Sequence, residues 1–519
     1  MGEQEFVSIL NDVLGPVMRG PSSSHTAGSY HIGRLARSLL GEEPKAGTFT
    51  FDPDGSYAQT FREQGADLGF ASGLMNWPIT DERFPQALEI AKKDGLRLSF
   101  RVKPLEHADH PNTVRILLEG RGGARLNIIA KSTGGGGVVI SLIEGLPVAL
   151  TGKAYDVVVL ARKAVLSSIL KVAGDSKRTA VETSGGGEAG LTLIDVRRTK
   201  PIEGEDLRRL RELPGVRKVW TCDPVFYVKK GESAFASGAA MADFAKKRKL
   251  SLGRAALVYE SQLLGLSEAE VLAEMGRRFD IMQSAVDLGL KEKDVRMRLL
   301  EPCAKKVFAS EAKGTMAIGG INTRAAARAM AALHISNSGG VICAAPTGAS
   351  AGVIPGVIVT LAEEKGLNRE QISQALLAAG AVGLIVARRA TFAAEVAGCQ
   401  VEIGAAGAMA AAMVVDWAGG SAEDATNAAA IAFQNTMGSV CDLVQGLCEI
   451  PCHTRNGVAA SNAFVCADLI LGGYRNPIPL DETIDAVFAS GKMLPRELRC
   501  TVQGGIALAP SARALRAKK

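Results

Sequence analysis

The property of this sequence that most restricts its fold is a change of hydrophobic pattern near residue 233. Before that point, short runs rich in β-branched and aromatic residues, such as GTFTFDP and NTVRILLEG, alternate with helical patterns. After it, strand signals nearly vanish, and segments such as INTRAAARAMAALHI repeat apolar residues at helical spacing with alanine as the main filler. The pattern predicts a mixed N-terminal part followed by an all-α domain of closely packed helices.

The N-terminal part divides again near residue 152. Residues 1–152 mix strand-like and helical segments, which predicts an α/β or α+β domain. Residues 153–232 follow the order strand, helix, strand, strand, helix, strand, which is the βαββαβ order of ferredoxin-like folds. With LRELPGVRKV near its end, this unit resembles an ACT domain, although the usual Asp-Arg-Pro-Gly opening is absent. We therefore predict a multidomain chain with boundaries at 1–152, 153–232 and 233–519.

Charge and hydropathy exclude several classes of function. The net charge of +6 is spread over 519 residues, without a block of five like charges or an aromatic-laced basic stripe, so nucleic-acid binding is not expected. The N-terminus lacks the basic-then-apolar pattern of a signal peptide. The richest apolar run, 403–415, is rich in Ala and Gly and stops at Asp416, so we expect no membrane span and a cytoplasmic protein.

The nine cysteines are unevenly distributed, since five lie between Cys399 and Cys466. In a reducing compartment they are not expected to form disulfides, and a free cysteine is most often a small buried apolar residue. Cys441 and Cys452 are 11 residues apart, which is neither the Cys-x-x-Cys of zinc ribbons nor the tight run of bacterial ferredoxins. Spacing alone leaves buried cysteines and metal ligands both open.

Two polar or glycine-rich segments suggest close contact with a ligand or with the backbone. GPSSSHTAG places hydroxyls and an imidazole just before a helical pattern, which suits an anion at a helix N-terminus, while Ser24 or Thr26 would also cap that helix. The run 134–137 is four glycines without the Gly-Lys-Ser/Thr ending of a P-loop, so it predicts a turn that lets two backbones approach closely.

Five stretches in order carry a family resemblance: GPSSSHTAG, APTGASAGVIPG, GCQVEIGAAGAMAAA, CDLVQGLCEIPCHTRN and GGIALAP. Together they resemble the iron-sulfur-dependent L-serine dehydratases over nearly the whole chain, with the small domain, the ACT-like unit and the helical domain fused. The resemblance implies a [4Fe–4S] cluster held by Cys399, Cys441 and Cys452, with one iron free of protein ligands. The cysteines that it leaves without a role as ligands are Cys222, Cys303, Cys343, Cys448, Cys466 and Cys500.

The resemblance also implies a reaction and a set of site residues. The open iron would bind the β-hydroxyl as a Lewis acid, a base would remove the Cα proton, and L-serine would give pyruvate and ammonia. The implied catalytic residues are Ser24, His25, Thr347 and Arg455. The implied substrate-binding residues are Ser22, Ser23, Ser24, His25, Thr26, Asn456 and Arg389. Glu395 and Glu402 flank Cys399 and would orient a ligand or a helix, and His110, Asn112 and Thr113 match the family's HPNT stretch in the small domain.

Three positions depart from the family pattern. Gln64 stands where the family has a histidine that is a candidate base, so His25 is the nearest alternative base. Arg389, beside Arg388, stands where a polar neutral residue is expected, and an arginine would suit a second carboxylate. Cys500 stands where a glutamate is usual, which leaves two interpretations open, a cap on the open iron in the resting state or an ordinary cysteine, and we favour the ordinary cysteine.

These departures keep a second enzymatic interpretation open, the dehydration of a β-hydroxy acid without an amino group, such as 2-(hydroxymethyl)glutarate. A third interpretation is a non-catalytic amino-acid sensor built around the ACT-like unit, but a sensor has no use for an open iron. In the enzymatic interpretations the partner is a small β-hydroxy acid. Because ACT-like modules commonly pair, we expect a homodimer or a higher homo-oligomer.

Overall fold

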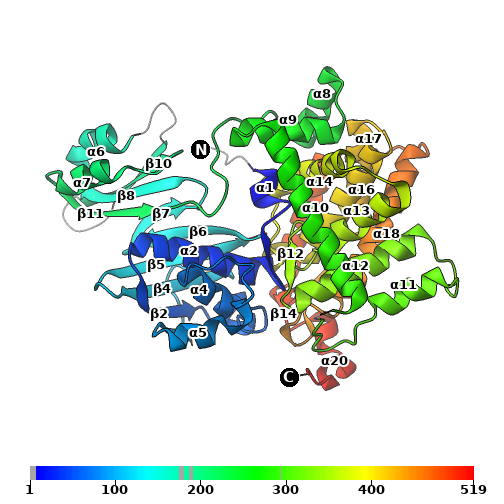
Figure 1. Cartoon of the computed structure of the whole chain (residues 1–519), viewed down its shortest axis with the longest axis horizontal. Coiled ribbons are helices and arrows are strands. Elements are labelled where there is room, and N and C mark those ends of the chain that lie inside the picture. Colours follow the sequence, from blue (N-terminus) through cyan, green and yellow to red (C-terminus); the bar gives the residue numbers. More distant parts are fainter. Residues whose placement is uncertain (1–6, 175–179, 186–190, 294, 519) are drawn as a thin grey trace.

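Two large β-sheets and a large group of helices make up most of the chain, with the two sheets on one side and the group of helices on the other (Figure 1). The computed structural model describes residues 7–174, 180–185, 191–293 and 295–518. The multidomain prediction, with a mixed N-terminal region and a helical C-terminal region, is confirmed at this level.

The first unit is a six-stranded sheet in the order β3-β2-β4-β5-β6-β7, in which β2 and β3 run parallel and the other neighbours antiparallel. Along β4, Val114, Ile116 and Leu118 are buried and the residues between them exposed, the period of two expected of a half-buried strand. Helices α2 and α4 supply apolar side chains to the same core. The elements of this unit are β2 (Pro44–Phe51), α3 (Ser56–Thr60), α4 (Ala66–Leu74), α5 (Ala87–Lys93), β3 (Arg97–Val102), β4 (Thr113–Gly120), β5 (Arg125–Gly134), β6 (Gly137–Ile143) and β7 (Leu146–Leu150), preceded by α2 (Gly28–Leu40).

The second unit has the predicted βαββαβ order of elements and a four-stranded antiparallel sheet in the order β11-β8-β10-β9. Its elements are β8 (Tyr155–Arg162), α6 (Leu166–Ala173), β9 (Ala180–Gly185), β10 (Leu191–Arg198), α7 (Gly204–Glu212) and β11 (Val216–Cys222). Val157 and Val159 of β8 pack in one core with residues of the two helices, while Val158 and Trp220 belong to the core of the first unit. The second sheet is therefore buried on both faces, between its own helices and the first unit.

The third unit is helical and contains the largest core. Its central helix, α16, is buried along 403–415 and packs against α14, α17 and α18, because alanine and glycine let their backbones approach. Its helices are α8 (Gly238–Arg248), α9 (Leu252–Leu264), α10 (Glu268–Lys291), α11 (Ala304–Ala312), α12 (Ile321–Asn337), α13 (Val353–Lys365), α14 (Arg369–Arg389), α15 (Ala394–Ala397), α16 (Ile403–Trp417), α17 (Ala422–Gln434), α18 (Cys452–Leu471), α19 (Leu480–Met493) and α20 (Pro510–Ala514).

Four short strands, paired two by two, tie distant segments to this helical unit. β1 (Val17–Arg19) pairs antiparallel with β12 (Val341–Cys343), and β13 (Cys441–Asp442) pairs parallel with β14 (Arg499–Thr501). The first described helix, α1 (Ile9–Asp12), also packs into the helical core, and the Glu260 carboxylate accepts hydrogen bonds from Ser8 Oγ and the following backbone amides. The N-terminal segment thus crosses from the helical unit to the first sheet before α2 begins.

Two helical segments, 369–389 and 399–417, are by length and composition long and apolar enough to cross a membrane, which the sequence had not led us to expect. However, 78% and 94% of their apolar windows are buried inside the protein. They satisfy the length and composition test because they are core helices, surrounded by other helices rather than by lipid.

Candidate active site

The three cysteines identified in the sequence come from the starts of three different elements. Cys399 opens a single 3-10 turn before α16, Cys441 lies in β13, and Cys452 opens α18, and each is at most 3% exposed. The Sγ atoms of Cys399 and Cys441 and a carboxylate oxygen of Glu402 all lie within 4.8 Å of one another. Such a group of buried thiols and a carboxyl is a candidate metal centre.

Gly398 lets Cys399 approach the strand that carries Cys441. Its φ is +76°, a value that favours glycine, and a Cβ at this position would lie 2.7 Å from the carbonyl oxygen of Ser439. A side chain here would therefore push the turn that carries Cys399 away from the segment leading into β13.

Two further thiols, Cys448 and Cys500, contact predicted ligands, although the sequence analysis did not count them among the ligands. Cys441 hydrogen-bonds with Cys399 and Cys500, and Cys448 with Cys452, and these contacts together with burial raise the pKa of Cys441 and of Cys448. Cys500 arrives because β14 runs beside β13, with Arg499 opposite Cys441, and its own φ is +61°. The pairing of two segments nearly 60 residues apart leaves no trace in cysteine spacing, and only the departure from the family pattern had marked Cys500 as a candidate to cap the iron.

Charged and polar groups surround the thiols. Arg455 pairs with Asp442 at 3.1 Å and donates to the carbonyl of Val440 at 2.8 Å. Burial lowers the pKa of Arg455, but attraction to Cys399 and to the other nearby acids outweighs burial and raises it. Burial also raises the pKa of Glu402 well above its usual range, while a hydrogen bond with Thr347 opposes that rise.

Both polar atoms of the Asn456 side chain form hydrogen bonds with backbone groups. Its Nδ2 donates to the carbonyls of Ala349 and Cys452, each at 2.9 Å, and its Oδ1 accepts from the amide of Gly352 at 3.1 Å. It fastens the start of α18 to the loop of Thr347. That loop also contacts the first unit, because a Cβ on Gly348 would lie 2.7 Å from the carbonyl of Pro21.

The serine-rich segment forms a π-helical turn, Ser23–Ala27, that leads directly into α2. The cap is Ser22, whose Oγ accepts from the amide of His25 at 3.1 Å, rather than Ser24 or Thr26 as predicted. The helical backbone begins before α2, so the capping position moves toward the N-terminus. Thr26 Oγ1 instead donates to the backbone carbonyl of Gln64.

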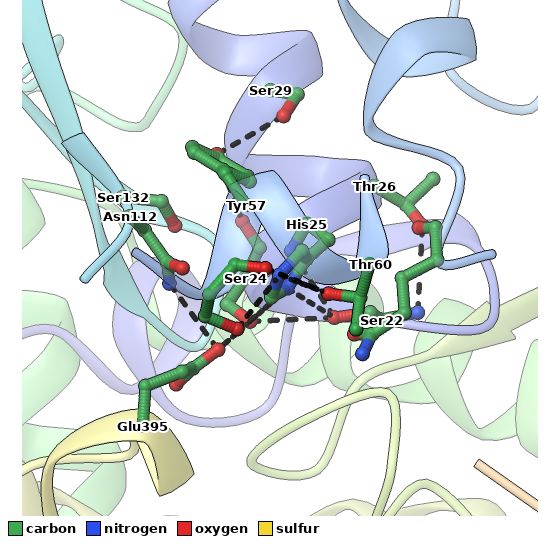
Figure 2. Close-up of polar contacts among 12 residues, drawn as sticks. Ser22, Ser24, His25, Thr26, Ser29, Tyr57, Thr60, Asn112, Ser132 and Glu395 are labelled. Carbon is green, nitrogen blue, oxygen red and sulfur yellow. Dashed lines mark hydrogen bonds and ion pairs between the residues drawn. The ribbon is translucent and has the colours of Figure 1, made fainter. Parts of the chain in front are cut away.

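Ser24 binds a carboxylate from another unit of the protein (Figure 2). Its Oγ donates to Glu395 Oε1 at 2.6 Å, and Asn112 Nδ2 donates to the same oxygen at 3.2 Å. Burial raises the pKa of Glu395, but attraction to His25 and the hydrogen bonds from Ser24 and Asn112 outweigh burial and lower it. The segment expected to hold an anion thus contacts a carboxylate of the chain itself.

His25 is fully buried between hydroxyl groups. Its Nδ1 lies 3.0 Å from Ser24 Oγ and 3.6 Å from Glu395 Oε1, and its Nε2 lies 3.1 Å from Thr60 Oγ1 and 3.3 Å from Ser56 Oγ. Because the Ser24 proton points to Glu395, the network favours a hydrogen on Nδ1 and a lone pair on Nε2. Burial lowers the pKa of His25 to about 4, so the ring is neutral near pH 7.

Other predicted residues lie nearby or elsewhere. The glycine run approaches the segment before α15 as expected, since a Cβ on Gly134 would lie 2.7 Å from the amide of Ala393. Arg389 is not brought to the thiols or to His25, and its guanidinium makes a two-pronged pair with the carboxylate of Asp485. Thus Ser24, His25, Thr347 and Arg455 lie around the domain interface and the thiols, and Arg389 lies apart from them.

Comparison with known proteins extends this picture. A family model described as "Serine dehydratase alpha chain" matches residues 231–507. The probable L-serine dehydratase alpha chain of Bacillus subtilis is 36% identical over 276 residues, which are 53% of this chain and 92% of that protein. The L-serine dehydratase alpha chain of Peptoniphilus asaccharolyticus is 34% identical over 242 residues, which are 46% and 83% of the two chains. The probable L-serine dehydratase beta chain of Bacillus subtilis is 33% identical over 213 residues, which are 40% and 94%.

Proposed function

This chain belongs to the serine dehydratase alpha-chain family, and from that premise we propose that it converts L-serine to pyruvate and ammonia with a [4Fe–4S] cluster as cofactor. As a member of this family it is an enzyme of the lyase class. The observation that carries the proposal is that a group of thiols and a polar network lie at the interface between the helical unit and the first unit. Buried thiols from the helical unit lie close to a buried carboxylate, hydroxyl and imidazole network that spans two units.

The residues present fit an iron-sulfur cluster. Cysteine thiolates are the usual ligands of such clusters, and the proposed ligands Cys399, Cys441 and Cys452 are buried at the starts of rigid elements. The mutual contacts that raise the pKa of Cys441 disfavour several thiolates side by side, and a bound cation would remove that penalty. When bound, the cluster supplies a Lewis acid for the substrate β-hydroxyl.

We assign the proton transfer to Ser24 and His25, supported by Glu395. In this assignment the Cα proton of serine passes to Nε2 of His25, whose lone pair in the neutral ring faces the hydroxyls of Thr60 and Ser56. The resulting imidazolium is stabilised by the Glu395 carboxylate, 3.6 Å from Nδ1. Arg455 offsets negative charge at the thiols, and Thr347 and Asn456 hold the surrounding loop.

The substrate without an amino group is not proposed. It depended on Arg388 or Arg389 binding a second carboxylate, and the guanidinium of Arg389 pairs with Asp485 on the helical unit. The relatives that match the chain are named for L-serine.

The direct test is anaerobic reconstitution with iron and sulfide, followed by measurement of pyruvate formed from L-serine. The Cys441→Ser variant should lose both bound iron and pyruvate formation. Cys466→Ser is the matched control, because Cys466 is equally buried but contacts Asn435 and Asn462 instead. Absence of pyruvate from an iron-loaded wild type would refute the proposed reaction, and full iron content in Cys441→Ser would refute the proposed ligand set.

A further inference from the structure

A cavity of about 300 Å³ opens at the interface where the first unit, α15 and β14 meet. Glu395 lines it from one side, and Ser56, whose Oγ is 3.3 Å from His25 Nε2, lines it from another. Arg499 and Thr501 line it on either side of Cys500, and Cys500 hydrogen-bonds with Cys441. The cavity therefore borders the proton-transfer network and the strand that carries Cys500, and its volume is at the lower end of small-molecule sites.

Arg499 brings a guanidinium to this cavity with an unused donor. Its Nη1 donates to the carbonyl of Val396 at 3.2 Å, whereas its Nε is buried and has no hydrogen-bond partner among the described residues. No acidic side chain in the described ranges forms an ion pair with it. A buried donor on a cation is costly to leave unpaired, so this position favours an anionic acceptor supplied from the cavity.

A second buried group in the lining of the cavity needs a hydrogen-bond donor rather than an acceptor. Oε1 of Gln59 is an acceptor without a hydrogen-bond partner in the part of the chain that the structure describes. The nearby Glu395 carboxylate adds negative charge to the same wall. An ammonium group would satisfy both, because it carries three donors and a positive charge.

These two requirements together describe an α-amino acid zwitterion, and we propose that Arg499 receives the carboxylate of the substrate while Gln59 accepts from its ammonium. The assignment rests on the proposed function for the identity of the amino acid. It differs from the anion cradle predicted at Ser22–Thr26, because the Ser24 hydroxyl is already donated to Glu395. Arg499, which sequence reasoning did not select, takes the place of that cradle and of Arg389.

The neighbouring Arg496 provides a matched comparison. It lines the same cavity, but its guanidinium is about half exposed and pairs with Asp54 at 3.2 Å. Because its charge is already paired and solvated, it contributes little to an anion in the interior. Replacing Arg496 by Gln therefore changes the net charge of the protein as much as replacing Arg499 by Gln. It leaves the buried Nε donor of Arg499 in place.

The test uses L-alanine, which has the carboxylate and ammonium of serine but no leaving group, with calorimetric titration into the reconstituted protein. Loss of one charge-assisted hydrogen bond predicts that Arg499→Gln weakens L-alanine binding about 10- to 100-fold, and that Arg499→Lys recovers part of it. Arg496→Gln should stay within about twofold of wild type. Gln59→Leu should weaken L-alanine more than propionate, which lacks the ammonium.

Iron content and thermal midpoint of each variant confirm that the fold is intact, and if Arg499→Gln does not fold, Arg499→Lys and Gln59→Leu carry the test. Unchanged L-alanine affinity and unchanged KM for L-serine in a folded Arg499 variant would overturn the assignment while leaving the dehydratase function standing. Conversely, tight L-alanine binding that depends on Arg499, in a protein that forms no pyruvate, would support the amino-acid site and refute the reaction.

Discussion

Ser24 is the residue whose single proton decides the polarity of the whole network. The Ser24 hydroxyl donates its hydrogen to Glu395 at 2.6 Å, so its oxygen accepts the hydrogen of His25 Nδ1. The other ring nitrogen, Nε2, then carries the lone pair, which faces Ser56. We expect Ser24→Ala to lower kcat/KM about 10- to 100-fold, because one hydrogen bond to a charged group is lost. Steady-state kinetics on protein with unchanged iron content measures this effect.

Ser72→Ala is the control for that substitution. Ser72 is fully buried, and its Oγ has no hydrogen-bond partner among the described residues, so its removal should leave kinetics unchanged. Equal kinetics in Ser24→Ala and wild type would show that Ser24 only packs at the interface.

His31 makes stability depend on pH in a predictable direction. Burial lowers its pKa to about 4, from an ordinary value of 6.5. Below pH 6.5 the unfolded chain binds a proton that the folded chain does not, so the free energy of unfolding falls as pH drops toward 4. Between pH 7 and pH 5 this contribution amounts to roughly 2 kcal/mol.

The measurement compares urea unfolding of wild type and His31→Gln at pH 7 and pH 5. The variant lacks the titrating ring, so the difference in stability between the two proteins should shrink by that amount at the lower pH. A difference that is the same at both pH values would mean that His31 is protonated in the folded protein as readily as in the unfolded chain.

At the scale of elements, the turn before α16 has to bring Cys399 to β13. Gly398→Ala places a Cβ 2.7 Å from the carbonyl of Ser439, so we expect the turn to shift and the reconstituted protein to lose iron. Gly419→Ala is the control, since Gly419 also has a positive φ, +84°, but nothing lies within 4 Å of the added Cβ. Iron analysis after anaerobic reconstitution should therefore separate the two variants, although each loses about 1–3 kcal/mol of stability from its positive φ. Equal iron content would show that the close approach at Gly398 does not position the thiol.

The long elements could be predicted from the sequence because their periodicity extends over many residues. The helical pattern INTRAAARAMAALHI corresponds to α12, and the alternation in NTVRILLEG corresponds to β4. The predicted helix EDATNAAAIAFQNTMGSVCDLV corresponds to α17 only as far as Gln434, and its second half is wrong because Cys441 lies in β13. The short strands β12, β13 and β14 have two or three residues each and depend on long-range pairing, so local patterns carry no signal for them. For the same reason local patterns carry no signal for the contact of Cys500 with Cys441, and only the departure from the family pattern had left Cys500 open as a cap on the iron.

The candidate site was only partly accessible from sequence. Cys399, Cys441 and Cys452 were named through the family resemblance, whereas their spacing alone left buried cysteines as an alternative. The contact between Ser24 and Glu395 joins residues 371 positions apart, and the side chain of Arg499 enters its cavity through strand register. Such relations depend on how whole units pack, which a local pattern does not contain.

At the scale of the molecule, the site is assembled from units that are distant in the chain. Glu395 and the thiols belong to the helical unit, while Ser24, His25 and Asn112 belong to the unit of the first sheet. The segment 7–19, which precedes α2, packs into the helical unit and pairs β1 with β12, so it holds the two together. That helix α1 would join the helical core could not be foreseen, because a helix of four residues has no periodicity to read.

The continuous backbone between these units has a kinetic consequence. The relatives in Bacillus subtilis are named as separate alpha and beta chains, whereas here both likenesses occur in one polypeptide. Joining two binding partners replaces a bimolecular encounter by an intramolecular one, at an effective concentration that dilution does not change. The specific activity of the intact chain should therefore stay constant from micromolar to nanomolar enzyme, while the same protein expressed as residues 1–232 and 233–519 should lose activity on dilution. A matching loss in the intact chain would mean that the active form is assembled between molecules, each completing the site of its neighbour.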